Sequence, residues 1–335
     1  MNVAEMFFGH FKRAFIQPGK LRDLGILGMN GRNVNYIARY NPRHLYPLVD
    51  NKLKTKKAAH KAGIATPKLI GYVESLGEIE RLLHRLQPMS DFVIKPTRGS
   101  GGKGIVVISA RDGELFVKPS GAKLTALDIR RHISDIMSGL YSLGGKPDSV
   151  MIETRVDFDP VFNDYSFEGV PDIRVIVFRG FPVMAMLRCS THSSDGRANL
   201  HQGAVGVGID LRSGRSIHAV QRNNPVRVHP DTQKPFSELR VPNWEKLLLL
   251  AAQCHDMTAL GYIGCDIVID KNLGPLILEL NARPGLSIQV ANGAGLLPRL
   301  QAIEALGEDE LAWPAEKRVE YSRSLFGHAR PVRVM

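Results

Sequence analysis

Three side chains that carry oxygen atoms come from one short part of the sequence, residues 261–286. This part reads GYIGCDIVIDKNLGPLILELNARPGL, and its apolar runs predict two strands, Tyr262–Ile269 and Pro275–Leu280, joined by a tight turn. Side chains alternate between the two faces of a strand, so residues two positions apart share a face. Three residues are therefore candidates for one common site: Asp266, Glu279 and Asn281.

The position of the turn decides whether the two strands bring these side chains together. A hairpin centred between Asn272 and Leu273 places Asp266 directly opposite Glu279, and Asn281 shares the face of Glu279. Oxygen ligands on a partly buried face suit Mg²⁺, which binds few carboxylates and completes its coordination with phosphates. The alternative is a solvated hairpin face whose carboxylates bind nothing.

A second candidate site is a lysine followed by a glycine-rich loop. Residues 91–96, DFVIKP, predict a buried strand, and a lysine in such a strand, here Lys95, normally has an anionic partner. The loop TRGSGGKG then leads into an apolar strand, residues 105–108, whereas Walker A and Rossmann loops both open a helix. We therefore expect a hairpin flap whose backbone N–H groups approach phosphates, with added charge from Lys103 or Arg98. An ordinary flexible hairpin tip is the alternative.

Composition limits the classes of protein that need to be considered. The 335 residues are 44% hydrophobic and 23% charged, which predicts a globular chain with two or three lobes. The three cysteines have no paired spacing, which indicates a reducing compartment and argues against a zinc site or a disulfide framework. The formal charge of +11 invites a nucleic-acid ligand, but the basic residues are spread along the chain without a recognised motif. We expect no nucleic acid as the primary ligand.

The beginning of the chain bears on localisation. Residues 1–20 are amphipathic but carry charged residues too early for a secretory signal, and no run of about 18 apolar residues predicts a transmembrane helix. We expect an N-terminal helix or a docking surface, and a cytoplasmic protein.

The remaining pattern alternates predicted helices and strands. The lysines that open the helix at residues 51–61 are expected on a solvated face: Lys52, Lys54, Lys56 and Lys57. Further helices are predicted at residues 77–86, 125–142 and 244–260, and strands at residues 149–156, 173–178 and 182–188. The charged residues from Asp309 onward are expected to be poorly ordered.

Six segments in a fixed order resemble the ATP-grasp enzymes, and within them the RimK-like carboxylate–amine ligases and the alpha-L-glutamate ligase-like proteins. The segments are NKLKTK, FVIKPTRGSGGKGIVV, VMIETRV, PDIRVIVF, DGRANLHQGA and GCDIVID…LILELNARPGL. The resemblance covers roughly residues 51–289 and implies the α+β class with an ATP-grasp fold. In this fold two α+β lobes enclose an ATP site, and the glycine flap closes over the phosphates.

The resemblance also implies a division of the chain. We expect a short N-terminal helix and connector at residues 1–50, where related ligases carry a fuller domain, and a charged C-terminal tail at residues 306–335. The ATP-grasp domain lies between them, with a flap-bearing lobe at residues 68–155 and a metal-bearing lobe at residues 156–305.

Roles for individual residues follow from the resemblance. The expected ATP contacts are Lys52 and Lys95 at the phosphates, Gly99, Ser100, Gly101, Gly102 and Lys103 in the flap, Glu153, Thr154, Arg155 and Val156 in the adenine hinge, and Asp172 at the ribose. The expected magnesium ligands are Asp266, Glu279 and Asn281. Arg197 and Asn199 match residues that face the phosphates or the acyl phosphate. Arg174 and Arg283 are candidates for binding the substrate carboxylate or the acyl phosphate, and the alternative for each is a structural salt bridge.

The chemistry implied by the family is phosphorylation of a carboxylate by ATP, followed by attack of an amine on the acyl phosphate to form an amide. The expected cofactors are ATP and Mg²⁺, with Mn²⁺ as a substitute. The expected partners are an amino acid, glutamate among the candidates, and an amine or carboxylate acceptor that includes a peptide or protein terminus. The alternatives are an ATP-grasp kinase that stops at a phosphorylated small molecule, and a non-catalytic nucleotide-binding or protein-binding module.

Overall fold

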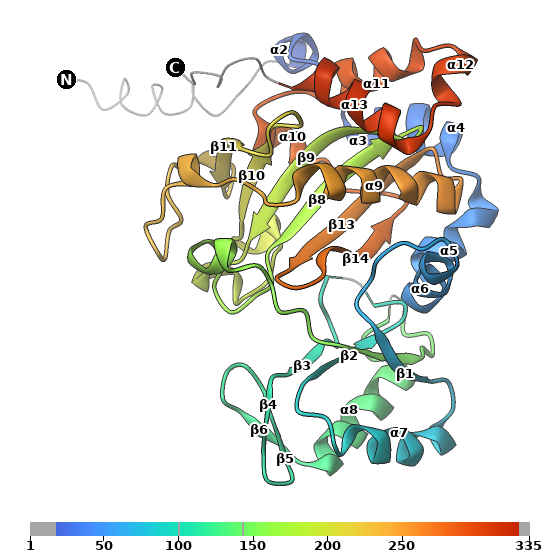
Figure 1. Cartoon of the computed structure of the whole chain (residues 1–335), viewed down its shortest axis with the longest axis vertical. Coiled ribbons are helices and arrows are strands. Elements are labelled where there is room, and N and C mark those ends of the chain that lie inside the picture. The colour runs from blue at the N-terminus through green and yellow to red at the C-terminus, as the bar shows by residue number, and fades with distance from the viewer. Residues whose placement is uncertain (1–17, 100, 143, 328–335) are drawn as a thin grey trace, which may run out of the picture.

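The protein is described by a computed structural model over residues 18–99, 101–142 and 144–327 (Figure 1). Most of the expected N-terminal helix at residues 1–20, and Ser100 of the flap, lie outside the described residues. The described chain forms a large lobe and a small lobe, each built on its own antiparallel sheet and its own apolar core.

The large lobe is built on a seven-stranded sheet with the order β12-β11-β10-β9-β8-β13-β14. Its strands are β8 (Asp172–Phe178), β9 (Phe181–Cys189), β10 (Val205–Ile209), β11 (Ser216–Gln221), β12 (Asn224–Pro225), β13 (Tyr262–Asp270) and β14 (Gly274–Asn281). Helix α9 (Trp244–Thr258) packs on one face, where the Cys265 thiol of β13 donates to the Ala251 carbonyl at 3.7 Å. The opposite face receives α10 (Ser287–Asn292), because Gly208 of β10 leaves room for its backbone and Gly206 leaves room for the Ala291 side chain.

The small lobe is built on a four-stranded sheet with the order β1-β7-β2-β3, covered by two helices. The elements are β1 (Leu69–Val73), η3 (Leu76–Glu78), α7 (Ile79–Leu86), β2 (Phe92–Pro96), β3 (Val106–Ile108), α8 (Ala126–Met137) and β7 (Val150–Glu153). A separate three-stranded sheet contains β4 (Ala110–Asp112), β5 (Leu115–Val117) and β6 (Lys123–Leu124). Strands β2 and β3 pair directly, so the predicted strand–glycine loop–strand hairpin is confirmed.

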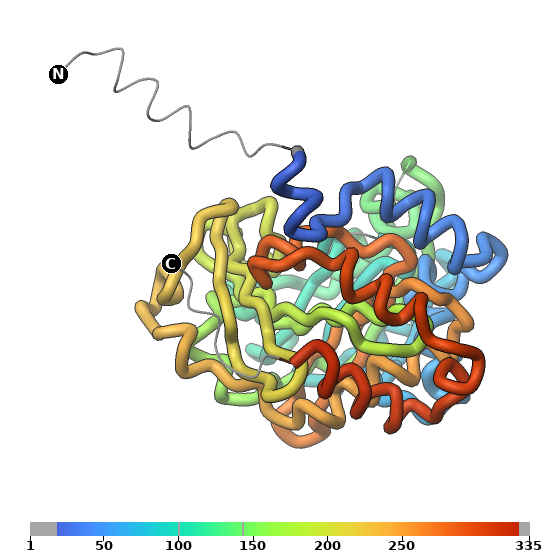
Figure 2. The backbone as a smooth tube through the Cα atoms, turned by 90° about the horizontal axis from the view of Figure 1, so that it is seen from above, coloured from blue at the N-terminus to red at the C-terminus, as the bar shows by residue number. Residues whose placement is uncertain are grey.

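The N-terminal segment belongs to the large lobe. It contains α2 (Pro18–Asp23), α3 (Met29–Gly31), η1 (Arg32–Ile37), α4 (Ala38–Tyr40), η2 (Arg43–Leu45), α5 (Tyr46–Asp50) and α6 (Lys52–Lys61). The Asn41 amide fixes this segment to the sheet, since it donates to the Tyr262 and Ala282 carbonyls and accepts from the Tyr262 N–H. The segment also meets the C-terminal helices, where the Tyr40 hydroxyl donates to Glu304 at 2.7 Å (Figure 2).

The expectation that the chain is poorly ordered from Asp309 onward is wrong for residues 308–326. These residues form α12 (Glu308–Leu311) and α13 (Ala315–Phe326), which follow α11 (Leu297–Glu304). In α13 the buried residues recur every three to four positions and pack on the large lobe: Ala315, Val319, Ser322 and Phe326. The charge of the segment concealed this apolar period.

Shorter elements complete the described chain. Helical turns lie at η4 (Pro160–Tyr165), η5 (His192–Ser194), η6 (Leu200–Gln202) and η7 (Phe236–Glu238). Within the residues that the structure covers, no helix is long and apolar enough to cross a membrane.

Candidate functional site

The β13–β14 hairpin pairs Asp266 with Glu279, as the sequence predicted, although the turn differs from the prediction. Asp270 pairs with Gly274, so the turn is centred on Asn272, and a β-bulge at Leu278 restores the predicted pairing. The Asp270 carboxylate shapes the turn by accepting the N–H groups of the two residues at 272 and 273, at 2.9 and 3.0 Å. The two carboxylates therefore lie side by side on one sheet face.

Two arginines from neighbouring strands hold Asp266 in an alternating network with Asp172, which we call the arginine–aspartate network. Arg174 lies opposite Asp266 on β8 and donates to both carboxylate oxygens at 2.7 and 2.6 Å. Arg188 on β9 contacts Asp266 at 2.8 Å and donates through two nitrogens to Asp172. The four charges sum to zero, and all four side chains are largely buried.

Burial and ion pairing act in opposite directions on the two carboxyls of this network. Burial acts to raise the pKa of Asp266, but the guanidinium groups of Arg174 and Arg188 outweigh it and hold that pKa well below its usual range. Burial raises the pKa of Asp172 to about 6, because Arg188 offsets the burial only in part and the Asp266 charge adds to it. Both carboxyls are therefore mainly ionised at neutral pH, and Asp266 stays ionised to a lower pH than Asp172.

Lys52 connects the metal candidate Glu279 with the flap. Its ammonium group donates to Glu279 at 3.0 Å and to the Gly99 carbonyl at 2.7 Å, and its backbone N–H donates to the Thr97 carbonyl at 2.8 Å. The Asn51 side chain caps helix α6 and so fixes the position of this lysine. The predicted phosphate contact thus lies where the two lobes meet.

Lys95 has the anionic partner that its burial predicted, and this partner is Glu153 on β7. A second lysine, Lys56, contacts the same carboxylate at 2.7 Å and also donates to the Pro67 carbonyl. The expectation of a solvated face is wrong for Lys52 and Lys56, because both side chains reach from α6 into the lobe junction. Lys95, Lys56 and Glu153, which we call the lysine–glutamate triad, carry a net charge of +1.

The electrostatics of the triad favour an anion. Burial acts to raise the pKa of Glu153, but the ammonium groups of Lys95 and Lys56 outweigh it and lower that pKa. Burial lowers the pKa of Lys56 although Glu153 opposes it. Glu153 therefore stays ionised, and with both lysines protonated the triad has a formal charge of +1.

The other residues of the expected adenine hinge connect the lobes. Thr154 pairs with Lys68, since its N–H donates to the Lys68 carbonyl at 2.9 Å and its hydroxyl oxygen accepts the Lys68 N–H at 3.1 Å. Arg155 contacts Asp91 at 3.5 Å, and Val156 packs on apolar residues of the β13–β14 hairpin. The hinge backbone is thus continuous with the metal-bearing hairpin.

Residues of both lobes line one pocket. The lining residues are Lys52, Thr55, Lys56, Thr66, Lys95, Met151, Ile277, Leu278 and Glu279. The structure therefore brings together the two lysines predicted to contact phosphates and one of the predicted metal ligands.

The backbone conformation of the flap requires glycine at three positions. Gly101, Gly102 and Gly104 have φ values of +64°, +75° and +75°, which side chains with a Cβ rarely adopt. Lys103 between them is exposed to solvent.

The flap is anchored at both of its ends. Gly99 forms a bridge with Ser142, and the Gly104 carbonyl lies 3.0 Å from the His132 ring nitrogen. A Cβ at Gly104 would lie 2.7 Å from the Tyr141 ring, so this glycine also permits a close aromatic contact. The Tyr141 ring is therefore an apolar anchor of the flap.

Two of the predicted catalytic residues lie in the loop between β9 and β10. Arg197 is exposed and contacts Asp195 at 3.7 Å, and the Asn199 side chain accepts the His201 N–H at 3.0 Å, as the cap of η6. The contacts of these side chains are within the loop, so their role at the phosphates stays a prediction.

Arg283 lies beside the metal candidates but points to the N-terminal segment. Its guanidinium group contacts Asp50 at 3.4 Å and lies 5.3 Å from the centre of the Tyr46 ring. Its backbone N–H donates to the Asn281 side-chain oxygen at 2.8 Å. Asn281 can therefore offer only the remaining lone pair of this oxygen to a metal ion.

The donor set on this face fits Mg²⁺. Asp266, Glu279 and Asn281 supply only oxygen atoms, and few protein ligands are needed when phosphates complete the coordination. Within the described residues no group of three or more His, Cys, Asp and Glu side chains could hold a metal ion, and the proposed set contains two carboxylates and one amide.

Sequence reasoning missed Arg188 and Lys56. Arg188 is a single charged residue near the end of the apolar strand β9, which is the signal that identified Lys95 in β2. Lys56 lies one helical turn after Lys52, on the side of α6 that faces the lobe junction.

Comparison with known proteins supports this architecture. Residues 31–305 match the model of one protein family, the sugar-transfer associated ATP-grasp proteins. No curated protein matches the chain. The match establishes the ATP-grasp superfamily and confirms the predicted α+β class with an ATP-grasp fold, whereas the RimK-like assignment stays a prediction.

Solved structures with a similar fold are distant in sequence. The ATP-grasp ligase PsnB with a minimal precursor is 12% identical with a TM-score of 0.42, over 84% of this chain and 63% of that chain. The D-cycloserine synthetase DcsG is 15% identical with a TM-score of 0.45, over 79% of this chain and 72% of that chain. The D-alanine–D-alanine ligase from Bacillus anthracis is 14% identical with a TM-score of 0.39, over 83% and 68%.

Proposed function

We propose, from the premise that this chain belongs to the sugar-transfer associated ATP-grasp family, that it is an ATP- and Mg²⁺-dependent ligase that joins a carboxylate to an amine. One observation carries the proposal. Asp266 and Glu279 lie side by side on a sheet face with two arginines, and Lys52 links this face to the glycine flap.

Phosphoryl transfer asks a protein mainly to position the phosphates and to counter their negative charge. Lys52 and Lys95 line the pocket between the lobes, and the triad around Lys95 has a formal charge of +1. In the proposed complex these lysines bind the ATP phosphates, and the flap N–H groups cover them. Mg²⁺ bound at Asp266, Glu279 and Asn281 would neutralise charge on the phosphate oxygens.

The arginine–aspartate network supplies further positive charge. Arg174 and Arg188 are both held by Asp266, one of the proposed metal ligands. When that carboxylate shares its charge with a cation, its attraction for the guanidinium groups weakens. We propose that one or both arginines then pair with the transferred phosphoryl group and with the acyl phosphate.

The proposed reaction has two steps and requires no nucleophilic side chain. A substrate carboxylate oxygen attacks the terminal phosphorus of ATP, which forms the acyl phosphate and releases ADP. The nitrogen of an amine then attacks the acyl carbon, phosphate leaves, and the amine loses a proton. The resemblance to RimK-like ligases favours an amino acid such as glutamate as one substrate, and a small molecule, peptide or protein terminus as the other.

Hydroxylamine trapping tests this proposal against the kinase alternative. The protein is incubated with Mg²⁺, ATP, hydroxylamine and a panel of amino acids and other carboxylates, and products are identified by mass spectrometry. An acyl phosphate yields a hydroxamate, whereas a phosphate ester made by a kinase does not. ADP release with a phosphate ester and without a hydroxamate would contradict the ligase, and substrate-independent nucleotide binding without ADP would favour the non-catalytic alternative.

The proposed site of action is the cytoplasm. The three buried cysteines, Cys189, Cys254 and Cys265, are free, as a reducing compartment would keep them.

A further inference from the structure

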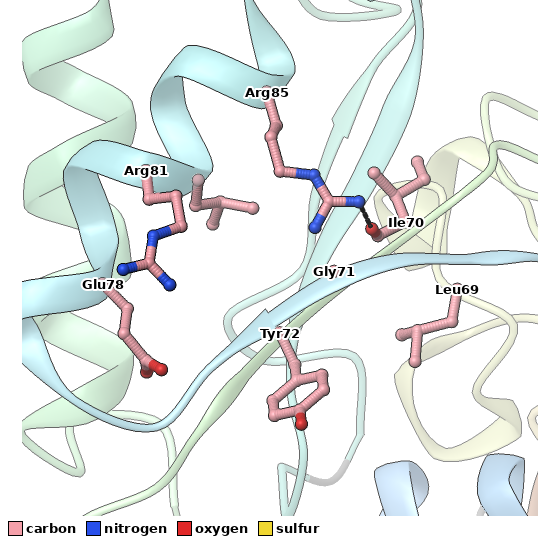
Figure 3. Close-up of a pocket in the computed structure, with 8 residues that line it drawn as sticks. Leu69, Ile70, Gly71, Tyr72, Glu78, Arg81 and Arg85 are labelled. Carbon is pink, nitrogen blue, oxygen red and sulfur yellow. Dashed lines mark hydrogen bonds between the residues drawn. The ribbon is translucent and has the colours of Figure 1, made fainter.

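A pocket on the small lobe lies apart from the candidate ATP site, between strand β1 and helix α7 (Figure 3). It is lined by Leu69, Ile70, Gly71, Tyr72, Glu78, Arg81, Leu82 and Arg85. Its volume is about 310 Å³, many times the roughly 30 Å³ of one water molecule, so it has room for more than a single small anion. None of these residues takes part in the proposed ligase reaction.

The strand that forms one wall of this pocket is the end of a sheet. β1 stands last in the order β1-β7-β2-β3, so within the described chain only one of its two edges is paired. Four consecutive strand residues, 69–72, line the pocket, so the pocket follows the strand over this length. A free strand edge accepts an extended peptide through its backbone groups.

The helix that forms the other wall supplies positive charge. Arg81 and Arg85 lie one turn apart on α7, and like charges at this spacing repel each other. Arg85 donates to the Ile70 carbonyl at 2.7 Å, which brings its guanidinium group over β1 (Figure 3). Arg81 has no hydrogen bond or ion pair within the described residues, although it lies near the Glu78 carboxylate.

The acidic residue in the pocket, Glu78, offsets only one of the two arginine charges. The Glu78 carboxylate accepts the N–H groups of Glu74 and Ser75 at 2.9 and 3.0 Å, as part of the capping box that begins the helical segment. The Lys57 ammonium lies 4.8 Å from the centre of the Tyr72 ring, and this ring points away from Arg81 and Arg85 (Figure 3), so Lys57 is not counted in the charge of the pocket. The pocket therefore has an excess of positive charge.

We propose that this pocket is a docking site for an extended acidic peptide of a partner protein, which lies along β1. Backbone groups of the peptide would pair with the strand edge beside the Ile70 carbonyl, which Arg85 already occupies. Its carboxylates would meet Arg81 and Arg85, and its apolar side chains would cover Leu69 and the exposed Tyr72 ring. This site is separate from the proposed ligase site and functions whether or not the chain is a ligase.

The test is peptide binding by the full chain without ATP. The probe is a fluorescein-labelled peptide in which Glu alternates with Val, followed by fluorescence anisotropy at low and high salt. Binding is expected, and it is expected to weaken as salt rises, since the charged groups are exposed. The variant Arg81→Glu/Arg85→Glu is expected to bind at least about tenfold more weakly, whereas Arg227→Glu/Arg240→Glu, the same charge change on the large lobe, is expected to bind as before.

A second peptide and a single-residue variant test whether the strand edge and Arg81 both contribute to binding. A peptide in which Glu alternates with Pro has the same charge but lacks half of its N–H groups, so it is expected to bind at least about fivefold more weakly. Arg81→Glu alone leaves the bond from Arg85 to Ile70 in place, and thermal unfolding of each variant checks the fold. Equal binding of the Val and Pro peptides, displacement by an equal concentration of free glutamate or phosphate, or unchanged binding by folded Arg81→Glu would each overturn the proposal.

Discussion

The large lobe and the junction between the lobes each contain a buried ionic network, and the two networks differ in net charge. The arginine–aspartate network of the large lobe pairs two acids with two bases and is neutral. The lysine–glutamate triad at the lobe junction pairs one acid with two bases and keeps a charge of +1. A neutral network can stay intact without a ligand, whereas a positive one is completed by an anion. We therefore propose that phosphate binds at the triad and that the metal ion binds at Asp266 of the network together with Glu279 and Asn281.

The difference originates in how each network is built. Adjacent strands of one sheet carry the arginine–aspartate network, so register fixes its side chains opposite one another. The triad combines two strands with a helix that precedes the small lobe, and its lysines are long and flexible.

The largest effect is expected for Asp266→Asn in the large lobe. The change removes one of two negative charges and leaves two buried guanidinium groups to share Asp172, so the free energy of unfolding should fall by about 3–5 kcal/mol. Urea denaturation measures this. The matched control is Asp172→Asn, where Arg188 keeps Asp266 as a partner and the loss should be smaller. Equal losses in the two variants would show that Asp266 is not the centre of the network.

A smaller effect, on turnover rather than stability, is expected for Lys95→Met in the triad. Lys56 still neutralises Glu153, so the variant should fold, while loss of one phosphate contact should slow ATP-dependent turnover by about 10²–10³-fold, or roughly 2–4 kcal/mol. The double variant Lys95→Met/Lys56→Met, which leaves Glu153 buried without a base, should be clearly less stable. Normal turnover in Lys95→Met would make this lysine purely structural.

Most of the elements and of the candidate site could be predicted from the sequence, because local patterns determined them. Alternation in β13 and β14 gave the pairing of Asp266 with Glu279, although the bulge at Leu278 that produces it has no local signal. The partners of Arg188 and Lys56 depend on which strands and helices meet, and this is a tertiary property. The high charge of residues 315–326 concealed the apolar period that makes α13 an ordered helix.

The smallest effect is expected in the flap. Tyr141 packs on Gly104, so the flap is only partly free before nucleotide binds. Addition of Mg²⁺ and ATP should slow hydrogen exchange at residues 101–104 by about tenfold, whereas residues 244–258 of α9 should not change. Tyr141→Ala should speed exchange in the free protein and enlarge this difference. Equal hydrogen-exchange protection of the flap with and without nucleotide would show that the flap does not cover the ATP phosphates.

We propose that the β13–β14 hairpin binds the catalytic Mg²⁺. The most direct test is ADP release across a Mg²⁺ titration for the wild-type protein, Glu279→Gln and Asn281→Ala, with circular dichroism to confirm the fold. Glu279 is partly exposed, so Glu279→Gln should fold and yet lose Mg²⁺-dependent turnover. Asn281→Ala should keep a measurable remnant, since it loses a neutral ligand. An unchanged Mg²⁺ dependence in Glu279→Gln would contradict the claim and separate the hairpin from the active site.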